Sequence, residues 1–363
     1  MTTPLHLAIN PVSFGQVSTC LLRELYNREE DISLTTLPAH GQIDLSTQEE
    51  DADFSAWLQK SMANFGTHHR RTNRIFKLWH LQGSLESFSN EQVLFSFYEL
   101  DQPTAEEINI VKNNHAVLFS SELSVQVFRN LGCDNVHYVP LCFDGFNFAA
   151  TKKEYHSDDR IVFNIVGKFE KRKHHVKAVQ AWIKKYGDKK EYALQCALWN
   201  PFLSGDQNSS VIAGLLGGKQ PFNVTFMGFM QKNSQYNDFL NSADVVLGVS
   251  GGEGWGLPEF HSVAMGKHAV VLDCSGYKGW ANSENAVLLN PSGKIPAYDN
   301  MFFRQGAPYN QGSIFDFDEE DFIGACEKSI ERVKKNRVNE EGMKLKKKFT
   351  SARTLDAILD HMK

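Results

Sequence analysis

The sequence lacks several features that mark particular classes of protein. No apolar run approaches the roughly 18 residues that a membrane-spanning helix needs, and no basic stretch precedes a long apolar one at the start, so we expect neither a membrane span nor a signal peptide. The 6 cysteines include no C-x-x-C pair, which argues against a zinc site or a disulfide framework and predicts reduced thiols in a cytoplasmic protein. A net charge of -5 argues against a protein that coats nucleic acid over its whole surface.

The composition is that of a folded protein, and the chain is long enough for more than one domain. Apolar residues make up 42% of the chain and charged residues 22%, which supplies packed cores and excludes global disorder. At about 150 residues per domain, a chain of 363 residues predicts two domains. The sequence has no internal repeat and no low-complexity segment, so a repeat architecture is not expected.

Short apolar strands alternate with helical segments in two runs. Strands of the first run are predicted at residues 5–10, 32–37, 74–81, 93–98, 116–120 and 136–141. Those of the second are predicted at residues 161–166, 192–198, 224–227, 245–249, 269–273 and 286–289. Between them we expect helices, one at residues 17–26 after a turn at Gly15 and another opened by a capping box of Thr104 and Glu107. The alternation predicts an α/β protein with two doubly wound parallel sheets, whose ligands bind at the carboxyl ends of the strands.

A polar stretch without periodicity, residues 143–160, separates the two runs. We interpret it as a linker between a first domain of residues 1–148 and a second domain of residues 158–337. After residue 318 the chain is predicted to be helical and charged to its end.

The most informative segment is residues 250–261, S-G-G-E-G-W-G-L-P-E-F-H, which follows a buried strand and opens a helix. Its glycines let the backbone approach a ligand, and the exposed N–H groups and helix dipole favour an anion such as a diphosphate. Glu253 lies within this glycine loop, where hydrogen bonds to sugar hydroxyls would explain a carboxylate beside an anion site. The competing interpretation is a tight strand-to-helix turn that binds nothing.

A second cluster follows the strand at residues 161–166. That strand ends at a glycine and leads into Lys168, Arg172 and Lys173 before the next helix. Cations beside a cleft suit a phosphorylated ligand and would neutralise the charge of a departing diphosphate. Taken alone, such a run is more often a solvated charged surface.

These segments resemble the retaining GT-B nucleotide-sugar glycosyltransferases of the family 4 type. The resemblance is carried by Glu253-Gly254-Trp255-Gly256-Leu257-Pro258 and by Ala264-Met265-Gly266, with flanking matches at residues 224–228 and 242–245. It covers residues 5–291, strongly in the second half and loosely in the first. It implies two Rossmann-like domains facing across a cleft, and a C-terminal helix, about residues 340–363, that crosses back to the first domain.

The resemblance also implies roles for particular residues of the second domain. Glu253 is expected to orient the donor sugar as a catalytic residue, and Gly228 to lie in the loop that binds the donor's base. The donor diphosphate is expected at Lys168, Arg172, Lys173, Gly254, Trp255, Gly256 and Leu257. His261 stands where the family has a second glutamate that holds the ribose. It can make only one such hydrogen bond, and Glu259, two residues earlier on the helix, is expected to point elsewhere.

The first domain offers weaker matches. Gly15 and Gln16 match the glycine turn that faces the donor in the family, Glu99 belongs to a segment on the acceptor side, and His80 ends a predicted strand where family members often place a histidine. A catalytic role for His80 and a structural hydrogen bond are equally favoured. Arg70 and Arg71 open a basic stretch that is either a solvated loop or a site for an anionic acceptor.

We therefore expect a metal-independent, retaining transfer of a hexosyl or pentosyl group from a UDP- or GDP-sugar to an unidentified hydroxyl, with no cofactor. The acceptor is a glycan, a lipid-linked sugar or a nucleic acid, and the basic stretch at residues 344–349 would allow contact with a membrane surface. The alternatives are a transferase acting on modified nucleic acid, a GT-B epimerase, and a degenerate nucleotide-sugar-binding module. The D-x-D patterns at residues 51–53 and 316–318 are interpreted as chance, so no metal site is expected.

Overall fold

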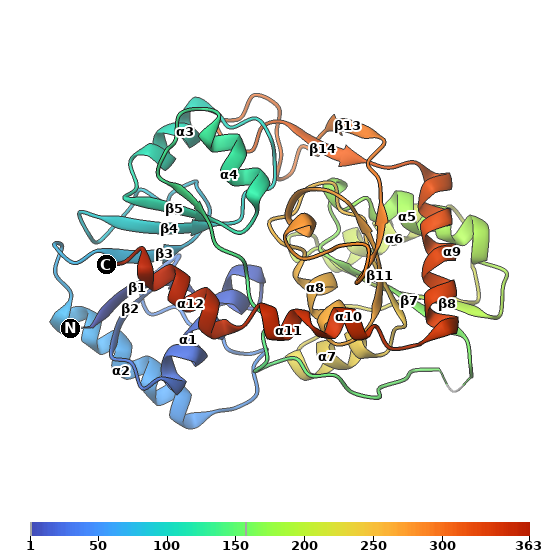
Figure 1. Ribbon diagram of the computed structural model, residues 1–363, viewed down its shortest axis with the longest axis horizontal. Helices are drawn as coiled ribbons and strands as arrows, with labels where there is room; N and C mark the ends of the chain where they lie inside the picture. Colours follow the sequence, from blue (N-terminus) through green and yellow to red (C-terminus); the bar gives the residue numbers. More distant parts are fainter. Residues whose placement is uncertain (1, 157) are drawn as a thin grey trace.

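The computed structural model describes residues 2–156 and 158–363, and it contains two six-stranded parallel sheets that lie side by side along the long axis (Figure 1). The strand order is β2-β1-β3-β4-β5-β6 in the first sheet and β12-β11-β10-β7-β8-β9 in the second. This confirms the predicted α/β architecture. The strands are short runs of buried apolar residues because helices cover the parallel sheets.

The first sheet and its helices comprise β1 (Thr3–Ala8), α1 (Ser13–Asn27), β2 (Ile32–Leu37), α2 (Ala52–His68), β3 (Ile75–Leu78), β4 (Gln92–Ser96), α3 (Ala105–Lys112), β5 (Ala116–Phe119), α4 (Glu122–Arg129) and β6 (Val136–Tyr138). The second comprises β7 (Ile161–Gly167), η1 (Lys171–Lys173), α5 (His175–Tyr186), β8 (Tyr192–Leu198), α6 (Gly205–Leu216), β9 (Val224–Phe226), α7 (Asn233–Asn241), β10 (Val245–Gly248), α8 (Leu257–Ala264), β11 (His268–Leu272), η2 (Ser275–Gly279), β12 (Val287–Leu289) and α9 (Glu319–Lys335). Between the two sheets, the described residues 139–156 and 158–160 form no helix or strand.

Several helix ends follow from local sequence. The predicted capping box is confirmed: the Glu107 N–H donates to Thr104 Oγ1 at 3.1 Å, and the Thr104 N–H donates to Glu107 Oε2 at 2.9 Å. Asp51 and Asp318 each accept backbone N–H groups in the first turn of the helix that follows. Both D-x-D patterns are therefore helix starts.

The turn predicted at Gly15 was wrong. Helix α1 already begins at Ser13, so Gly15 lies in its first turn. A Cβ atom at this position would lie 1.9 Å from the backbone oxygen of Asn10, which leaves room for glycine alone.

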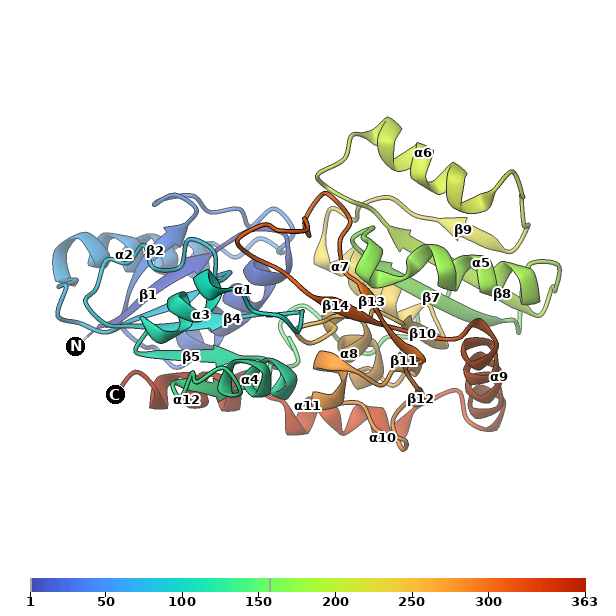
Figure 2. The ribbon, with the colours of Figure 1, turned by 90° about the horizontal axis from the view of Figure 1, so that it is seen from above.

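The chain crosses back to the first domain at its C-terminus, as expected. Helices α10 (Glu340–Met343), α11 (Leu345–Lys348) and α12 (Ser351–Asp360) run along one side of both domains (Figure 2). Helix α12 packs on α1, where the Arg28 Nη1 to Asp356 Oδ1 distance is 2.6 Å. Both ends of the chain lie at the first domain (Figure 1).

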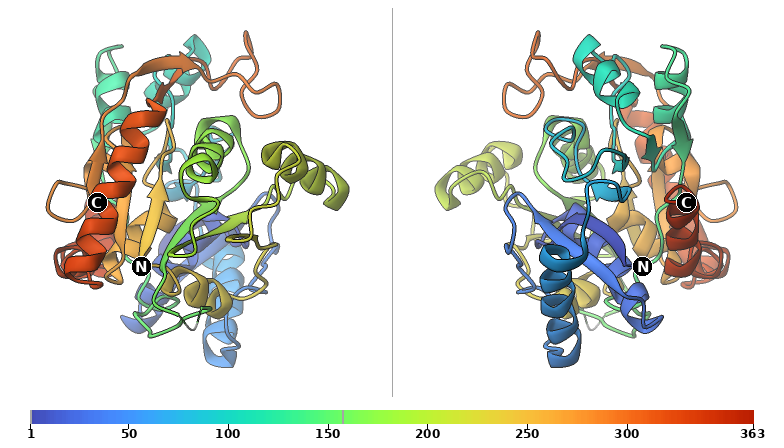
Figure 3. Two further views of the ribbon diagram at one scale, coloured as in Figure 1. Left: turned by 90° about the vertical axis from the view of Figure 1, so that its right-hand side faces the viewer. Right: turned by 90° about the vertical axis from the view of Figure 1, so that its left-hand side faces the viewer.

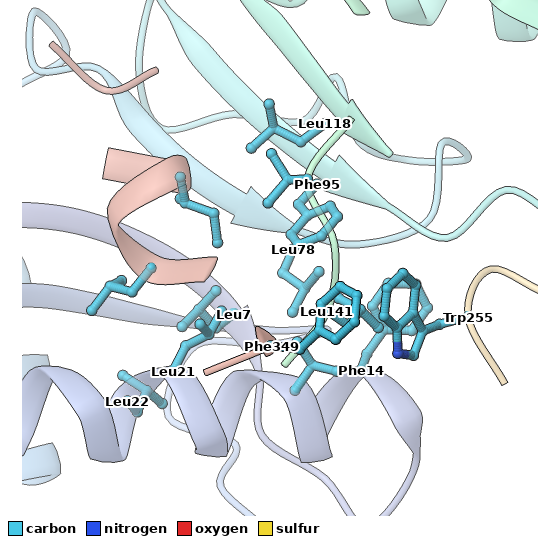
Figure 4. Close-up of a cluster of buried hydrophobic side chains, with 14 of the residues drawn as sticks. Leu7, Phe14, Leu21, Leu22, Leu78, Phe95, Leu118, Leu141, Trp255 and Phe349 are labelled. Carbon is cyan, nitrogen blue, oxygen red and sulfur yellow. The ribbon is translucent and has the colours of Figure 1, made fainter. Parts of the chain in front are cut away.

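One hydrophobic cluster joins the two domains. It contains the inward residues of the first sheet together with Trp255 from the glycine loop and Phe349 from the C-terminal segment (Figure 4). Trp255 is 2% exposed, and its ring packs against Phe260 and Phe349 at centroid distances of 5.4 Å. Burial of this apolar surface holds the glycine loop against the first domain.

A hairpin absent from the sequence-based predictions also connects the domains. Strands β13 (Gly293–Pro296) and β14 (Ser313–Asp316) pair antiparallel, and the loop between them, residues 297–312, extends well beyond them (Figure 3). We call residues 297–312 the bridging loop. Phe303 within it is buried in a cluster with Tyr98 and other residues of the first domain. The segment was missed because its residues show neither helical nor strand periodicity.

Candidate active site between the two sheets

The predicted site lies where the carboxyl ends of neighbouring strands face the other domain. Strands β7 and β10 are adjacent in the second sheet, and their following loops carry the cations and the glycine loop. Loops after β4 and β5 of the first sheet approach them, and Ser120 Oγ donates to the Gly254 carbonyl at 2.8 Å. The fold thus joins segments more than 100 residues apart in the sequence.

Six charged side chains form one network here, which we call the charge cluster: Lys168, Arg172, Lys173, Glu99, Glu170 and Glu253. The Arg172 guanidinium contacts Glu99 at 2.9 Å, Glu170 at 2.8 Å and Glu253 at 3.0 Å. Lys173 pairs with Glu253, and Lys168 pairs with Glu170. The contact between Glu99 and Arg172 joins the two domains.

Protonation in the charge cluster follows from burial and from these pairs. Burial by itself would raise the pKa of Glu253, but Lys173 and Arg172 outweigh it and hold this pKa at about 2. Burial raises the pKa of Glu99, with Arg172 acting in the opposite direction. Burial and the neighbouring Arg172 charge lower the pKa of Lys168 to about 8. At neutral pH the cations and Glu253 are therefore charged.

The glycine loop is held by backbone bonds to the elements around it. The Glu253 N–H donates to Ser275 Oγ at 3.1 Å, and the Glu253 carbonyl accepts from the Gly276 N–H at 3.0 Å. A Cβ at Gly254 would lie 2.7 Å from Phe97 Cβ, so the close approach of the first domain at this position requires glycine. Gly256 has φ +79 and precedes α8, which begins with no side-chain cap. Pro258 in that first turn has no N–H, and no side chain caps the turn, so the positive end of the helix dipole is open to an anion.

His261 is 1% exposed, and both of its ring nitrogens bond to the backbone. Nδ1 donates to the Leu257 carbonyl at 2.7 Å, and Nε2 accepts from the Asp144 N–H at 3.1 Å. Burial lowers the pKa of His261 to about 4, so the ring is neutral. In this structure His261 joins α8 to the segment between the domains and offers neither nitrogen to a ribose.

Three predicted residues of the first domain lie at the carboxyl edge of its sheet. His80 follows β3, and its ring lies 4.5 Å from that of Phe14. Desolvation of the ring and the Lys168 charge lower the pKa of His80 to about 4. Gln16 follows Gly15 in α1, and its Nε2 has no hydrogen-bond partner among the residues described. His80 therefore faces the charge cluster as a neutral ring.

Other predicted residues are not brought into the charge cluster. Arg70 and Arg71 precede β3, whereas His80 follows it, so the two arginines lie at the opposite end of that strand. Arg70 Nη1 donates to the Thr67 and His69 carbonyls at 3.1 and 2.8 Å. Gly228 is exposed after the edge strand β9, and the Trp255 side chain belongs to the hydrophobic cluster described above.

The structure adds residues that sequence reasoning missed. Glu170 lies between the cations in the sequence, which was its only signal, and its side chain is 2% exposed. Glu259, expected to point elsewhere, is 2% exposed and faces Gly256. Tyr277 from η2 lies against the same glycine, and Phe302 of the bridging loop covers Lys168 with its ring centroid 4.1 Å from Nζ. Only the tertiary fold places these four together.

Metal ligands and membrane-spanning helices were both sought among the residues that the structure describes. Residues 2–156 and 158–363 contain no group of three or more His, Cys, Asp or Glu side chains that could hold a metal ion. In the same residues no helix has the length and apolar character needed to cross a membrane.

Comparison with known proteins rests on structure. No protein-family model matches the sequence, and no curated protein matches it. Sucrose-phosphate synthase from Thermosynechococcus elongatus has a TM-score of 0.66 at 13% identity, with 99% of this chain and 97% of that chain covered. Anabaena HepE in complex with UDP-glucose has a TM-score of 0.64 at 12% identity, with 99% of both chains covered. WaaG, a glycosyltransferase involved in lipopolysaccharide biosynthesis, has a TM-score of 0.60 at 10% identity, with 98% of both chains covered. These neighbours are GT-B glycosyltransferases, and the present chain has their fold.

Proposed function

We propose that this protein is a glycosyltransferase that moves a sugar from a nucleotide-diphosphate donor to an acceptor hydroxyl with retention of configuration and without a metal ion. The observation that carries the proposal is the charge cluster beside the uncapped start of α8. Three cations and the uncapped first turn of α8 lie together at the carboxyl edge of a parallel sheet, which suits a diphosphate. The complex of Anabaena HepE with UDP-glucose favours a UDP-sugar as the donor to test first.

Lys168, Arg172 and Lys173 would bind the donor diphosphate together with the N–H groups at the start of α8. Each cation is paired with a carboxylate in the structure, so the cations are held in place before the donor binds. As the sugar leaves, the same groups neutralise the charge that develops on the diphosphate. This is the task that a bound metal performs in other transferases.

Glu253 would orient the donor sugar through its hydroxyl groups. Its carboxylate is ionised and fixed by Lys173 and Arg172, and its backbone is fixed by Ser275 and Gly276. Glu99 and His80 reach the same place from the first domain, where the acceptor hydroxyl would enter. A neutral His80 can accept a hydrogen bond from a hydroxyl, while the ionised Glu253 accepts two or more.

The change Glu253→Ala tests the assignment. We expect sugar transfer to fall at least about 100-fold, because the variant loses the group that orients the sugar and leaves the buried Lys173 without its carboxylate partner. Transfer is measured with UDP-glucose and GDP-glucose as donors and with EDTA present, and nuclear magnetic resonance reports the anomeric configuration of the product. Glu331→Ala, an exposed change on α9, is the matched control.

Two results would contradict the proposal. Transfer by Glu253→Ala near the level of the unmodified protein would remove the role of Glu253. Turnover of donor that yields an isomerised nucleotide-sugar without an acceptor would assign an epimerase instead. Donor binding is followed independently as a rise in melting temperature, since a ligand that binds only the folded state stabilises it by mass action.

A further inference from the structure

Glu259 is a buried carboxylate with an unused oxygen at the start of α8. It lies in the first turn of that helix, and its side chain is directed back toward Gly256. A Cβ on Gly256 would lie 3.1 Å from Glu259 Oε2. Neither this oxygen nor the hydroxyl of the neighbouring Tyr277 has a partner at full hydrogen-bond geometry among the residues described, and Glu259 as a whole is 2% exposed. A buried polar atom left without a partner requires an explanation in a folded protein.

The groups around Glu259 supply little positive charge to balance an ionised carboxylate. Lys173 from η1 is the nearby cation, but it is paired with Glu253 from the glycine loop. Tyr277 from η2 and Tyr236 from α7 also face Glu259, and both are neutral because burial raises their pKa. On the side of β10, a Cβ at Gly248 would lie 2.8 Å from Glu259 Cγ. The Glu259 carboxyl group is thus enclosed, and the one cation near it, Lys173, is already paired with Glu253.

Ionisation of such a group is unfavourable. Burial, reinforced by the Glu253 charge and opposed by Lys173, raises the pKa of Glu259 to about 7. A diphosphate at the start of α8 would add negative charge to the same helix end and would draw Lys173 toward itself. Both effects disfavour the ionised form of Glu259.

We propose that the Glu259 carboxyl group is neutral in the complex with the donor, so that each ionised Glu259 takes up a proton from solvent when the diphosphate binds at the start of α8. The proton goes to Oε2, and the site then holds the diphosphate without an opposing carboxylate behind it. The inference rests on the proposed function, because it requires a diphosphate at this helix end.

Isothermal titration calorimetry of the whole protein with UDP-glucose tests the inference. Titrations at about pH 7 in buffers of different ionisation enthalpy give the number of protons taken up, and the diphosphate of UDP-glucose does not itself titrate near this pH. A group with a pKa of about 7 is half protonated at pH 7, so we expect uptake of about half a proton. The isosteric change Glu259→Gln should remove this uptake.

Burial also raises the pKa of Glu99, and any proton that Glu99 takes up is common to the unmodified protein and Glu259→Gln. Lys168 is a further group near the site that titrates in this range. Its pKa of about 8 leaves it roughly nine-tenths protonated at pH 7, so it accounts for at most about a tenth of a proton. Between about pH 6.5 and 8 the Kd of the unmodified protein for UDP-glucose should rise about tenfold or more, because Glu259 and Lys168 both lose protons over this range. In Glu259→Gln the rise should be about twofold, which is the contribution of Lys168.

The outcomes separate this inference from the proposed function. Binding of UDP-glucose without proton uptake, or equal uptake in Glu259→Gln, overturns the role of Glu259 and leaves the glycosyltransferase proposal standing. Absence of binding by both UDP-glucose and GDP-glucose overturns both. If Glu259→Gln does not fold, the pH dependence of Kd in the unmodified protein still decides, because a flat profile over the same pH range contradicts the inference.

Discussion

Each cation of the charge cluster is held by a carboxylate from a different part of the chain. Glu99 comes from the loop after β4, Glu170 from the turn before η1, and Glu253 from the glycine loop. Without these partners the three cations would repel one another, and the two lysines would lose their protons more readily. The carboxylates therefore hold the cations in place before an anionic ligand binds.

At the residue scale, Glu259 gives the protein a pH-dependent stability. Its folded pKa of about 7 lies above the ordinary value of 4.5, so between these values the folded protein binds more protons than the unfolded chain. The contribution of Glu259 to the free energy of unfolding is therefore fully present below pH 4.5 and is lost as the pH rises through 7. The change Glu259→Gln should stabilise the protein by about 1–3 kcal/mol at pH 8 and by much less at pH 5.

Urea unfolding at the two pH values measures this difference. The matched control is Glu106→Gln, which makes the same chemical change at an exposed residue in the first turn of α3. It should alter the free energy of unfolding equally at both pH values. An equal effect of Glu259→Gln at the lower and the higher pH would contradict the prediction.

At the scale of the element, close backbone contact at the start of α1 depends on a single glycine. Gly15→Ala would place a Cβ 1.9 Å from the Asn10 backbone oxygen and 2.4 Å from its nitrogen, and neither backbone atom can rotate away. We expect a loss of about 3 kcal/mol in the free energy of unfolding, because α1 must shift against β1. Chemical denaturation gives this value.

The matched control lies on the next helix. Gly66 in α2 has no atom within 4 Å of an added Cβ and does not adopt a positive φ. Gly66→Ala should therefore stabilise the protein by about 0.5–1 kcal/mol, since alanine has the higher helix propensity. The prediction fails if the two substitutions change stability in the same direction.

At the scale of the whole molecule, the bridging loop links the two domains through Asp101. The Asp101 carboxylate accepts from Lys294 Nζ at 2.6 Å and from the Ser313 N–H at 2.8 Å, on the two strands that flank the loop. The bridging loop also places Phe302 over Lys168. The Asp101 contacts that hold the loop therefore also help to shape the charge cluster. Opening of the cleft to admit a donor must either break the Asp101 contacts or move the hairpin with the first domain.

Asp101→Ala should loosen the bridging loop on the first domain, while Thr104 and Glu107 keep their contacts with it. The Ser313 N–H and Lys294 lose their acceptor, and a loss of about 1.4 kcal/mol would raise the population of the detached loop about tenfold. Hydrogen exchange followed by mass spectrometry should show faster exchange of residues 297–312. Asp273→Ala, which removes an exposed pair with Lys278, should leave that exchange unchanged. Equal exchange rates in both variants would show that Asp101 does not hold the loop.

The sequence by itself determined the features that depend on neighbours along the chain. The strands of both sheets were predicted because strands buried on both faces are continuous apolar runs, as at residues 116–119. The capping box of Thr104 and Glu107 and the cations after β7 also follow from short-range spacing. Glu253 and Lys173 follow adjacent parallel strands, and the carboxyl ends of such strands meet at one edge, so their proximity was predictable.

Only the tertiary structure decided which residues distant in the sequence meet. His261 bonds to Asp144, Glu99 pairs with Arg172, and Glu259 is enclosed by Tyr277, each through contacts that no local pattern encodes. The position of Arg70 at the far end of β3 and the hairpin at residues 293–316 were likewise fixed by packing. The physical reason is that burial and ion pairing act between groups close in space, whereas sequence periodicity reports only which face of an element is apolar.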